Sequence, residues 1–112
     1  MFGNLFGRSD AASPDLTGYD DLQAMLGRKE CALVDVREPA EFAGGHAPGA
    51  INLPLSQFDP AKLPRGRVVL ICKSGRRSGN ALALARRAGI ENITHFAGGM
   101  GRWQSLGGAI VR

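Results

Sequence analysis

Cysteine is scarce in this sequence of 112 residues, which holds only Cys31 and Cys72, far apart along the chain. A domain of this length buries roughly two-thirds of the surface that its unfolded chain exposes, so its core does not need a disulfide framework. The segment 1–7 lacks both the basic start and the long apolar run of a secretory signal. We therefore expect a cytoplasmic protein in which both cysteines are reduced.

Aromatic residues and long apolar runs are also few. Only 6% of the residues are aromatic, and no run approaches the ~20 apolar residues that cross a membrane as a helix. The formal charge of +4 favours anionic partners, but the basic residues are not interleaved with aromatic ones as they are in single-strand-binding proteins. We expect no membrane or nucleic-acid partner, and interpret the charge as a solvated surface with one anion site.

The spacing that builds metal sites is missing as well. Neither His46 nor His95 belongs to a set of histidines, cysteines and acids arranged to hold zinc. We expect both histidines to make structural hydrogen bonds. The sequence thus predicts no metal and no other cofactor.

Short strands and helices alternate along the chain. Apolar and β-branched runs predict strands at 32–36, 50–53, 68–71 and 93–96, and helices are predicted at 17–27, 39–42 and 78–88, with a last short helix around Trp103. This order predicts a three-layer α/β/α domain over residues 15–112 with a small, mostly parallel central sheet. Residues 1–14 are predicted to be a flexible N-terminal tail.

Two predicted helices carry specific expectations. The segment from Thr17 to Asp20 has the spacing of a capping box, in which the Thr17 side chain would accept amide hydrogen bonds at the helix start. The helix at 78–88 places four apolar residues at helical spacing and should turn them toward the sheet. These residues are Ala81, Leu84, Ala85 and Ala88.

Cys72 directly follows the most apolar predicted strand and precedes a predicted helix. Reactive sites in open α/β sheets lie at the carboxyl ends of strands, where Cys72 would be. The amides of residues 74–77 can surround a negative charge on sulfur, and Gly75 can take the positive φ that such a loop needs. A cysteine at a helix N-terminus beside cations has its pKa lowered from about 8.5 to roughly 3.5–7.5. Cys72 is therefore predicted to be a nucleophilic thiolate.

Cys31 has none of these features. It opens a predicted strand, and no glycine-containing loop or cluster of cations surrounds it. A cysteine in that setting is predicted to pack in the core.

Four segments, ALVDVREPAEF, GHAPGAINLP, VVLICKSGRRS and FAGGMGRW, follow one another between residues 15 and 107. In this order and at these separations they resemble the rhodanese domain family, and specifically its single-domain sulfurtransferases. The resemblance implies a rhodanese-like fold in which Cys72 carries sulfur as a persulfide and the following residues complete the active-site loop. It assigns substrate binding to Lys73, Ser74, Gly75, Arg76, Arg77 and Ser78.

The resemblance also covers residues outside the loop. Asp35 and Arg37 match the family's DVR motif, which supports the loop from the neighbouring strand, and we expect this pair to fix geometry. The residues 98–99 and Trp103 are expected to pack.

The implied activity is that of a sulfurtransferase of the thiosulfate:cyanide type. The Cys72 thiolate would take the outer sulfur of a small anionic donor such as thiosulfate and pass it to a thiophilic acceptor, either cyanide or a thiol. A sulfur-relay protein is a further candidate partner. This chemistry requires no cofactor.

Two alternatives remain open. A cysteine-dependent phosphatase or arsenate reductase of related fold would use a similar loop, but such phosphatases share the pattern C-x5-R, whereas Ser78 is the sixth residue after Cys72 and Arg77 comes one place early. A non-catalytic rhodanese-like binding module would keep the fold without the chemistry, and the intact Cys72 argues against it.

Overall fold

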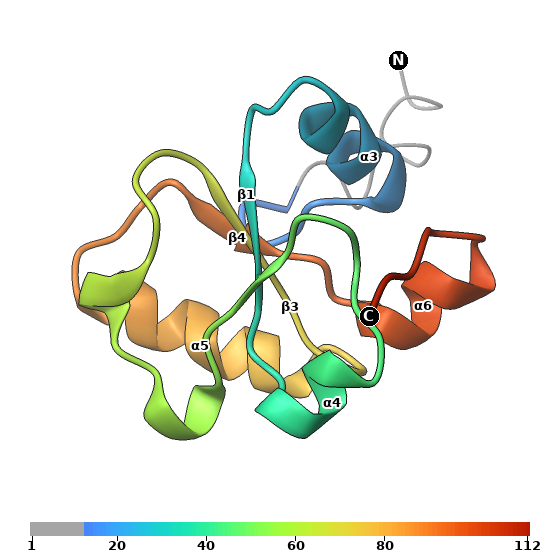
Figure 1. The fold of residues 1–112 in the computed structure, drawn as a ribbon. Helices are drawn as coiled ribbons and strands as arrows, with labels where there is room; N and C mark the ends of the chain where they lie inside the picture. Colours follow the sequence, from blue (N-terminus) through green and yellow to red (C-terminus); the bar gives the residue numbers. More distant parts are fainter. Residues whose placement is uncertain (1–12) are drawn as a thin grey trace, which may run out of the picture.

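The computed structural model describes residues 13–112, which fold around a four-stranded sheet (Figure 1). The spatial order of the strands is β2 (Ile51–Asn52), β1 (Ala32–Asp35), β3 (Val68–Ile71) and β4 (Ile93–His95). Every neighbouring pair is parallel. The predicted α/β class with a small parallel sheet is confirmed. The predicted tail lies outside the described residues except for Ser13 and Pro14.

Helices cover both faces of the sheet (Figure 1). Successive side chains of β3 alternate: Val69 and Ile71 pack with α3 (Tyr19–Gly27) and α6 (Gly99–Ser105), whereas Val68 and Leu70 pack with α5 (Arg76–Arg87). All four β3 residues are buried, as expected for a parallel strand that is covered on both faces. The predicted three-layer architecture is confirmed.

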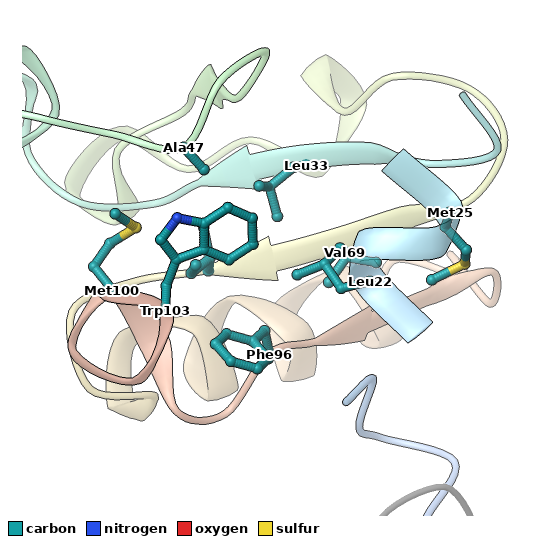
Figure 2. Close-up of a cluster of buried hydrophobic side chains, with 9 residues drawn as sticks. Leu22, Met25, Leu33, Ala47, Val69, Phe96, Met100 and Trp103 are labelled. Carbon is teal, nitrogen blue, oxygen red and sulfur yellow. The ribbon is translucent and has the colours of Figure 1, made fainter. Parts of the chain in front are cut away.

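Trp103 is the centre of the core on the α3 and α6 side (Figure 2). It is 2% exposed, and its indole Nε1–H donates to the carbonyl of Ala109 at 2.8 Å. The ring of Tyr19 meets it edge-on at a centroid distance of 5.5 Å. The predicted packing role of Trp103 is confirmed.

The face that α5 turns to the sheet agrees with the prediction at Ala81 and Ala85 but differs at Leu84 and Ala88. The helix buries Ser78, Ala81, Leu82 and Ala85, while Leu84 is 41% exposed and Ala88 is exposed. The prediction placed only apolar side chains on the buried face. In the structure Ser78 is also buried, and this turns Leu84 and Ala88 away from the sheet. A buried serine requires hydrogen-bond partners, and the site described below supplies them.

The predicted capping box at the start of α3 is wrong. The N-cap residue is Gly18, which has no side chain to accept an amide, and the hydroxyl of Thr17 instead pairs with the hydroxyl of Thr94 at 2.5 Å. A capping box forms at α4 (Pro39–Ala43), where Glu38 and Glu41 exchange hydrogen bonds. Tertiary contact with β4 thus outweighs the local capping signal at Thr17.

Two short 3-10 turns, η1 (Leu55–Gln57) and η2 (Pro60–Lys62), lie in the connection between β2 and β3. This connection lies over the α5 side of the sheet, where Leu53, Leu55, Phe58 and Leu63 pack against the buried residues. Within residues 13–112, no helix combines the length and apolar character that crossing a membrane requires.

Replacing Leu82 with Ala should lower the free energy of unfolding by about 2–5 kcal/mol, because this buried side chain leaves a cavity between α5 and the sheet. Replacing Leu84 with Ala, on the same helix, should change the free energy of unfolding by only about 0.5 kcal/mol, because Leu84 is exposed at the surface and lies outside the core. Urea denaturation of both variants measures the difference. Equal losses would show that α5 does not present this face to the sheet.

Candidate active site

Cys72 lies at the carboxyl end of β3 and is 1% exposed. Its sulfur accepts the Gly75 amide N–H at 3.0 Å and lies 3.5 Å from the Ser78 hydroxyl. Burial alone would raise the pKa of the Cys72 thiol, but the Ser78 hydroxyl and the amides of Ser78, Gly75 and Ser74 outweigh it and lower that pKa below its ordinary value. Hydrogen bonds are thus the main influence that stabilises the thiolate, and the charge of Arg77 also acts on it.

Gly75 gives the loop its shape. Its φ of 100° is in the left-handed region, and a Cβ atom there would lie 2.0 Å from the carbonyl oxygen of Ala97. Gly75 is also the N-cap residue of α5, so the helix starts at Arg76, two residues before the predicted start at Ser78. Because of this earlier start, Arg76 and Arg77 belong to the first helical turn and not to an irregular loop.

Ser78 is fully buried. Its hydroxyl lies 3.2 Å from the carbonyl oxygen of Gly75 and 2.8 Å from Nδ1 of His95. The sequence analysis missed His95 as a neighbour of this site, since no spacing connects β4 with α5. The two residues meet because α5 packs against β4.

The cations of the loop divide into two kinds. Arg77 forms a bidentate ion pair with Glu41 of α4, with N–O distances of 2.7 and 3.0 Å. The hydrogen bond from Arg77 lowers the pKa of Glu41 to about 2, so the pair stays ionised at neutral pH. Lys73 and Arg76 are exposed. The substrate contacts predicted for Lys73 and Arg76 stay predictions. The same holds for Arg77, whose ion pair with Glu41 is not visible in the sequence.

Asp35 and Arg37 form a buried ion pair beside the loop. The Arg37 Nε–H and Nη2–H groups donate to the Asp35 carboxylate at 2.8–3.0 Å, and Nη2 also donates to the carbonyl oxygen of Gly45 at 2.8 Å. The side-chain amide of Asn52 donates to the carbonyl oxygens of both residues. These hydrogen bonds therefore tie β1, β2 and the segment after α4 together. The predicted support of the cysteine loop by this pair stays a prediction.

The start of α6 holds the other side of the loop. The amides of Met100 and Gly101 donate to the carbonyl oxygens of Cys72 and Lys73 at 2.7 and 3.1 Å. A Cβ atom on Gly99 would lie 2.4 Å from the Lys73 carbonyl group, so only glycine permits this approach. The packing role predicted for residues 98–99 is thus a close contact with the active-site loop.

A groove of about 380 Å³ lies next to the loop. Lys73, Arg37 and Gly101 line it together with the C-terminal residue Arg112.

Cys31 and His46 lie outside the cysteine loop. Cys31 is half-buried against the core, and burial raises the pKa of its thiol, which agrees with the predicted packing role. Nδ1 of His46 lies 2.8 Å from the carbonyl oxygen of Phe42, whose ring stacks on the imidazole. Among residues 13–112, no three His, Cys, Asp or Glu side chains converge in a way that would hold a metal ion.

Comparison with known proteins places the chain in a family. The model of the Rhodanese-like domain matches residues 19–106. An uncharacterized protein from Synechocystis is 46% identical over 89 residues, which are 77% of this chain and 50% of that protein, so the chain spans about half the length of this relative. The human thiosulfate:glutathione sulfurtransferase is 32% identical over 74% of this chain and 87% of its own.

Comparison with solved structures gives the same family as the sequence comparison. The crystal structure of a rhodanese-related protein from Thermoplasma volcanium matches with a TM-score of 0.78 and 30% identity, covering 87% of this chain and 97% of the other. The family match, the parallel sheet and the cysteine loop at the end of β3 agree, and the chain belongs to the rhodanese-like domain family.

Proposed function

We propose that this protein is a sulfurtransferase that carries sulfur as a persulfide on Cys72. The observation that carries the proposal is the lowered pKa of a cysteine whose sulfur accepts the Gly75 amide and adjoins the Ser78 hydroxyl. Such a thiolate attacks sulfur without a separate general base. The human relative is a thiosulfate:glutathione sulfurtransferase, which supports thiosulfate as a donor.

The first half-reaction transfers sulfur to the enzyme. The Cys72 thiolate attacks the outer sulfur of thiosulfate and forms a new S–S bond. The original S–S bond of thiosulfate breaks, and sulfite leaves with its electron pair. The outer sulfur, now bound to Cys72 as a persulfide, keeps its negative charge, which the loop amides stabilise.

The second half-reaction regenerates the thiolate. A thiolate or cyanide acceptor attacks the outer sulfur of the persulfide, and Cys72 departs with the electron pair of the broken S–S bond. The groups that lower the pKa of Cys72 also make it a better leaving group. The groove beside Lys73 offers room for the acceptor.

The charge around the loop favours an anionic donor. Lys73 and Arg76 are exposed beside the cysteine, whereas Arg77 is neutralised by Glu41. Exposed cations raise the local concentration of an anion and stabilise the sulfite that leaves.

The observed loop argues against the phosphatase alternative. At the sixth position after Cys72, where such phosphatases have an arginine, this chain has the fully buried Ser78. The nearby Arg77 is already paired with a carboxylate, so it is poorly placed to hold a phosphoryl group. The lowered pKa of Cys72 likewise argues against a module that only binds a partner.

Incubation with thiosulfate should add one sulfur atom to the wild-type protein, and cyanide should then remove it, because the outer sulfur of a persulfide is electrophilic. Intact-protein mass spectrometry measures both steps. The Cys72→Ser variant should take up no sulfur, while Cys31→Ser should load as the wild type does. Release of phosphate from an aryl phosphate by a protein that gains no sulfur would favour the phosphatase alternative.

Gly75→Ala should slow the loading of Cys72 by thiosulfate at least about tenfold, because a side chain there collides with Ala97 and moves the Gly75 amide away from sulfur. The matched control is Gly89→Ala, since Gly89 also has a positive φ, of 90°, but has open space around its Cβ position. This control should lose stability and retain the loading rate. Equal slowing in both variants would mean that backbone strain alone explains the effect.

Glu41→Gln should raise the loading rate with thiosulfate about threefold, because it leaves Arg77 with a net positive charge beside Cys72 while keeping the amide cap of α4. The rate with the neutral reagent iodoacetamide should change little. Glu30→Gln makes the same change in total charge at the surface pair with Arg28 and serves as the control. If Glu41→Gln leaves the rate of loading with thiosulfate unchanged, the proposal that the loop cations attract an anionic donor is wrong.

A further inference from the structure

His95, at the end of β4, is 9% exposed and is joined to Cys72 through one intervening side chain. Its Nδ1 lies 2.8 Å from the Ser78 hydroxyl oxygen, which lies 3.5 Å from the Cys72 sulfur. Three side chains from β4, α5 and the end of β3 therefore form one continuous line of polar atoms. The sulfur-transfer steps described above do not use His95.

The hydroxyl of Ser78 has a single proton and three neighbours. The neighbours are the Cys72 sulfur, Nδ1 of His95 and the carbonyl oxygen of Gly75. When Cys72 is a thiolate, its sulfur can only accept hydrogen bonds. The Ser78 proton stabilises that charge only if it points to the sulfur, and an Nδ1–H group on His95 favours this orientation because it donates to the Ser78 oxygen and cannot accept from it.

We propose that His95 is a positioning residue of the Cys72 site: in the thiolate state its Nδ1–H donates to the Ser78 oxygen, and the Ser78 hydroxyl donates to the Cys72 sulfur. The inference rests on the proposed role of Cys72 as the nucleophile. No proton is transferred along this line, and each hydrogen stays on its own atom. The arrangement stabilises Cys72 both when it attacks the donor and when it leaves the persulfide.

The surroundings of His95 suit a neutral donor. Burial is the main influence and lowers the pKa of His95; the charged groups that act on it are Asp15, before α3, and Arg86, on α5. These two side chains form an ion pair with each other, and they act on the pKa of His95 in opposite directions. With one ring proton at neutral pH, His95 can donate through Nδ1 without bringing a charge to the site.

The backbone of His95 is held in place from the N-terminal side of the domain. Its amide donates to the carbonyl oxygen of Asp15 at 3.0 Å, and its carbonyl oxygen accepts the amide of Thr17 at 3.1 Å. The charged residues around Cys72 are Lys73, Arg76 and two ion pairs, Arg77 with Glu41 and Arg37 with Asp35, and none of them lies on β4. Substitutions at His95 therefore leave the charges around the cysteine unchanged.

Two amide variants test the geometry. The side-chain nitrogen of Asn lies near the position of Nδ1, whereas that of Gln extends toward the position of Nε2. His95→Asn should keep the pKa of Cys72 close to that of the wild type, while His95→Gln should raise it by roughly half a unit, because the hydrogen bond that polarises Ser78 is lost. Ser78→Ala should raise it by about one unit, since it removes a hydrogen bond to a charged group. In the Ser78→Ala background, His95→Gln should cause no further shift.

The measurement is the pH dependence of Cys72 alkylation by iodoacetamide, made in the Cys31→Ser background so that a single thiol reacts. His46→Gln is the control, because Nδ1 of His46 contacts a backbone carbonyl that is not connected to Cys72. It should leave the pH profile unchanged. Identical profiles for His95→Asn and His95→Gln, or an additive shift in the double variant, would overturn the proposal.

This experiment is independent of sulfur transfer, since alkylation uses no sulfur donor. Suppose that His95→Gln shifts the pKa of Cys72 only when Ser78 is present, in a protein that fails to load with thiosulfate. This result would retain the role of His95 and reject the sulfurtransferase proposal. Normal loading with a pH profile that does not respond to His95→Gln would reject only the role of His95. A loss of thermal stability without a shifted profile would show that His95 serves packing alone.

Discussion

The structure depends most on how the backbone turns between β3 and α5. Gly75 takes a left-handed conformation that directs its amide at the Cys72 sulfur and starts a helix at the next residue. The same turn lies so close to Ala97 that a side chain would not fit. One backbone constraint therefore provides a hydrogen bond to the thiolate, the N-terminus of α5 and tight packing against the segment before α6.

The neighbouring elements hold this turn by hydrogen bonds to its backbone and by ion pairs around it. Amides at the start of α6 donate to the carbonyl oxygens of Cys72 and Lys73, and the buried pair of Asp35 with Arg37 ties β1 to the segment after α4. Such pairs add little net stability when buried, but breaking one is costly, so they favour a single geometry. The site is preorganised, as electrostatic stabilisation of a developing charge requires.

The two cysteines show that environment decides reactivity. Cys31 is only half-buried, yet the pKa of its thiol is raised, because burial is not offset by hydrogen bonds. Cys72 is more deeply buried, yet its pKa is lowered, because amides and the Ser78 hydroxyl stabilise the thiolate. Burial is the larger single influence in both cases, and what differs is whether donors point at the sulfur.

Local pattern was sufficient for the strands, the layers and the place of Cys72 between a strand and a helix, because apolar runs, glycine placement and the strand-loop-helix order are properties of neighbouring residues. Local pattern was insufficient for the buried face of α5, because Ser78 contacts His95 on β4. It was also insufficient for the cap of α3, because Thr17 contacts Thr94 on the same distant strand. The pairing of Arg77 with Glu41 joins residues from α5 and α4 in the same way. The amino-acid sequence by itself singled out Cys72 as the candidate nucleophile; only the tertiary structure decided which groups lower the pKa of its thiol, because hydrogen bonds and ion pairs depend on distances between elements that sequence spacing does not contain.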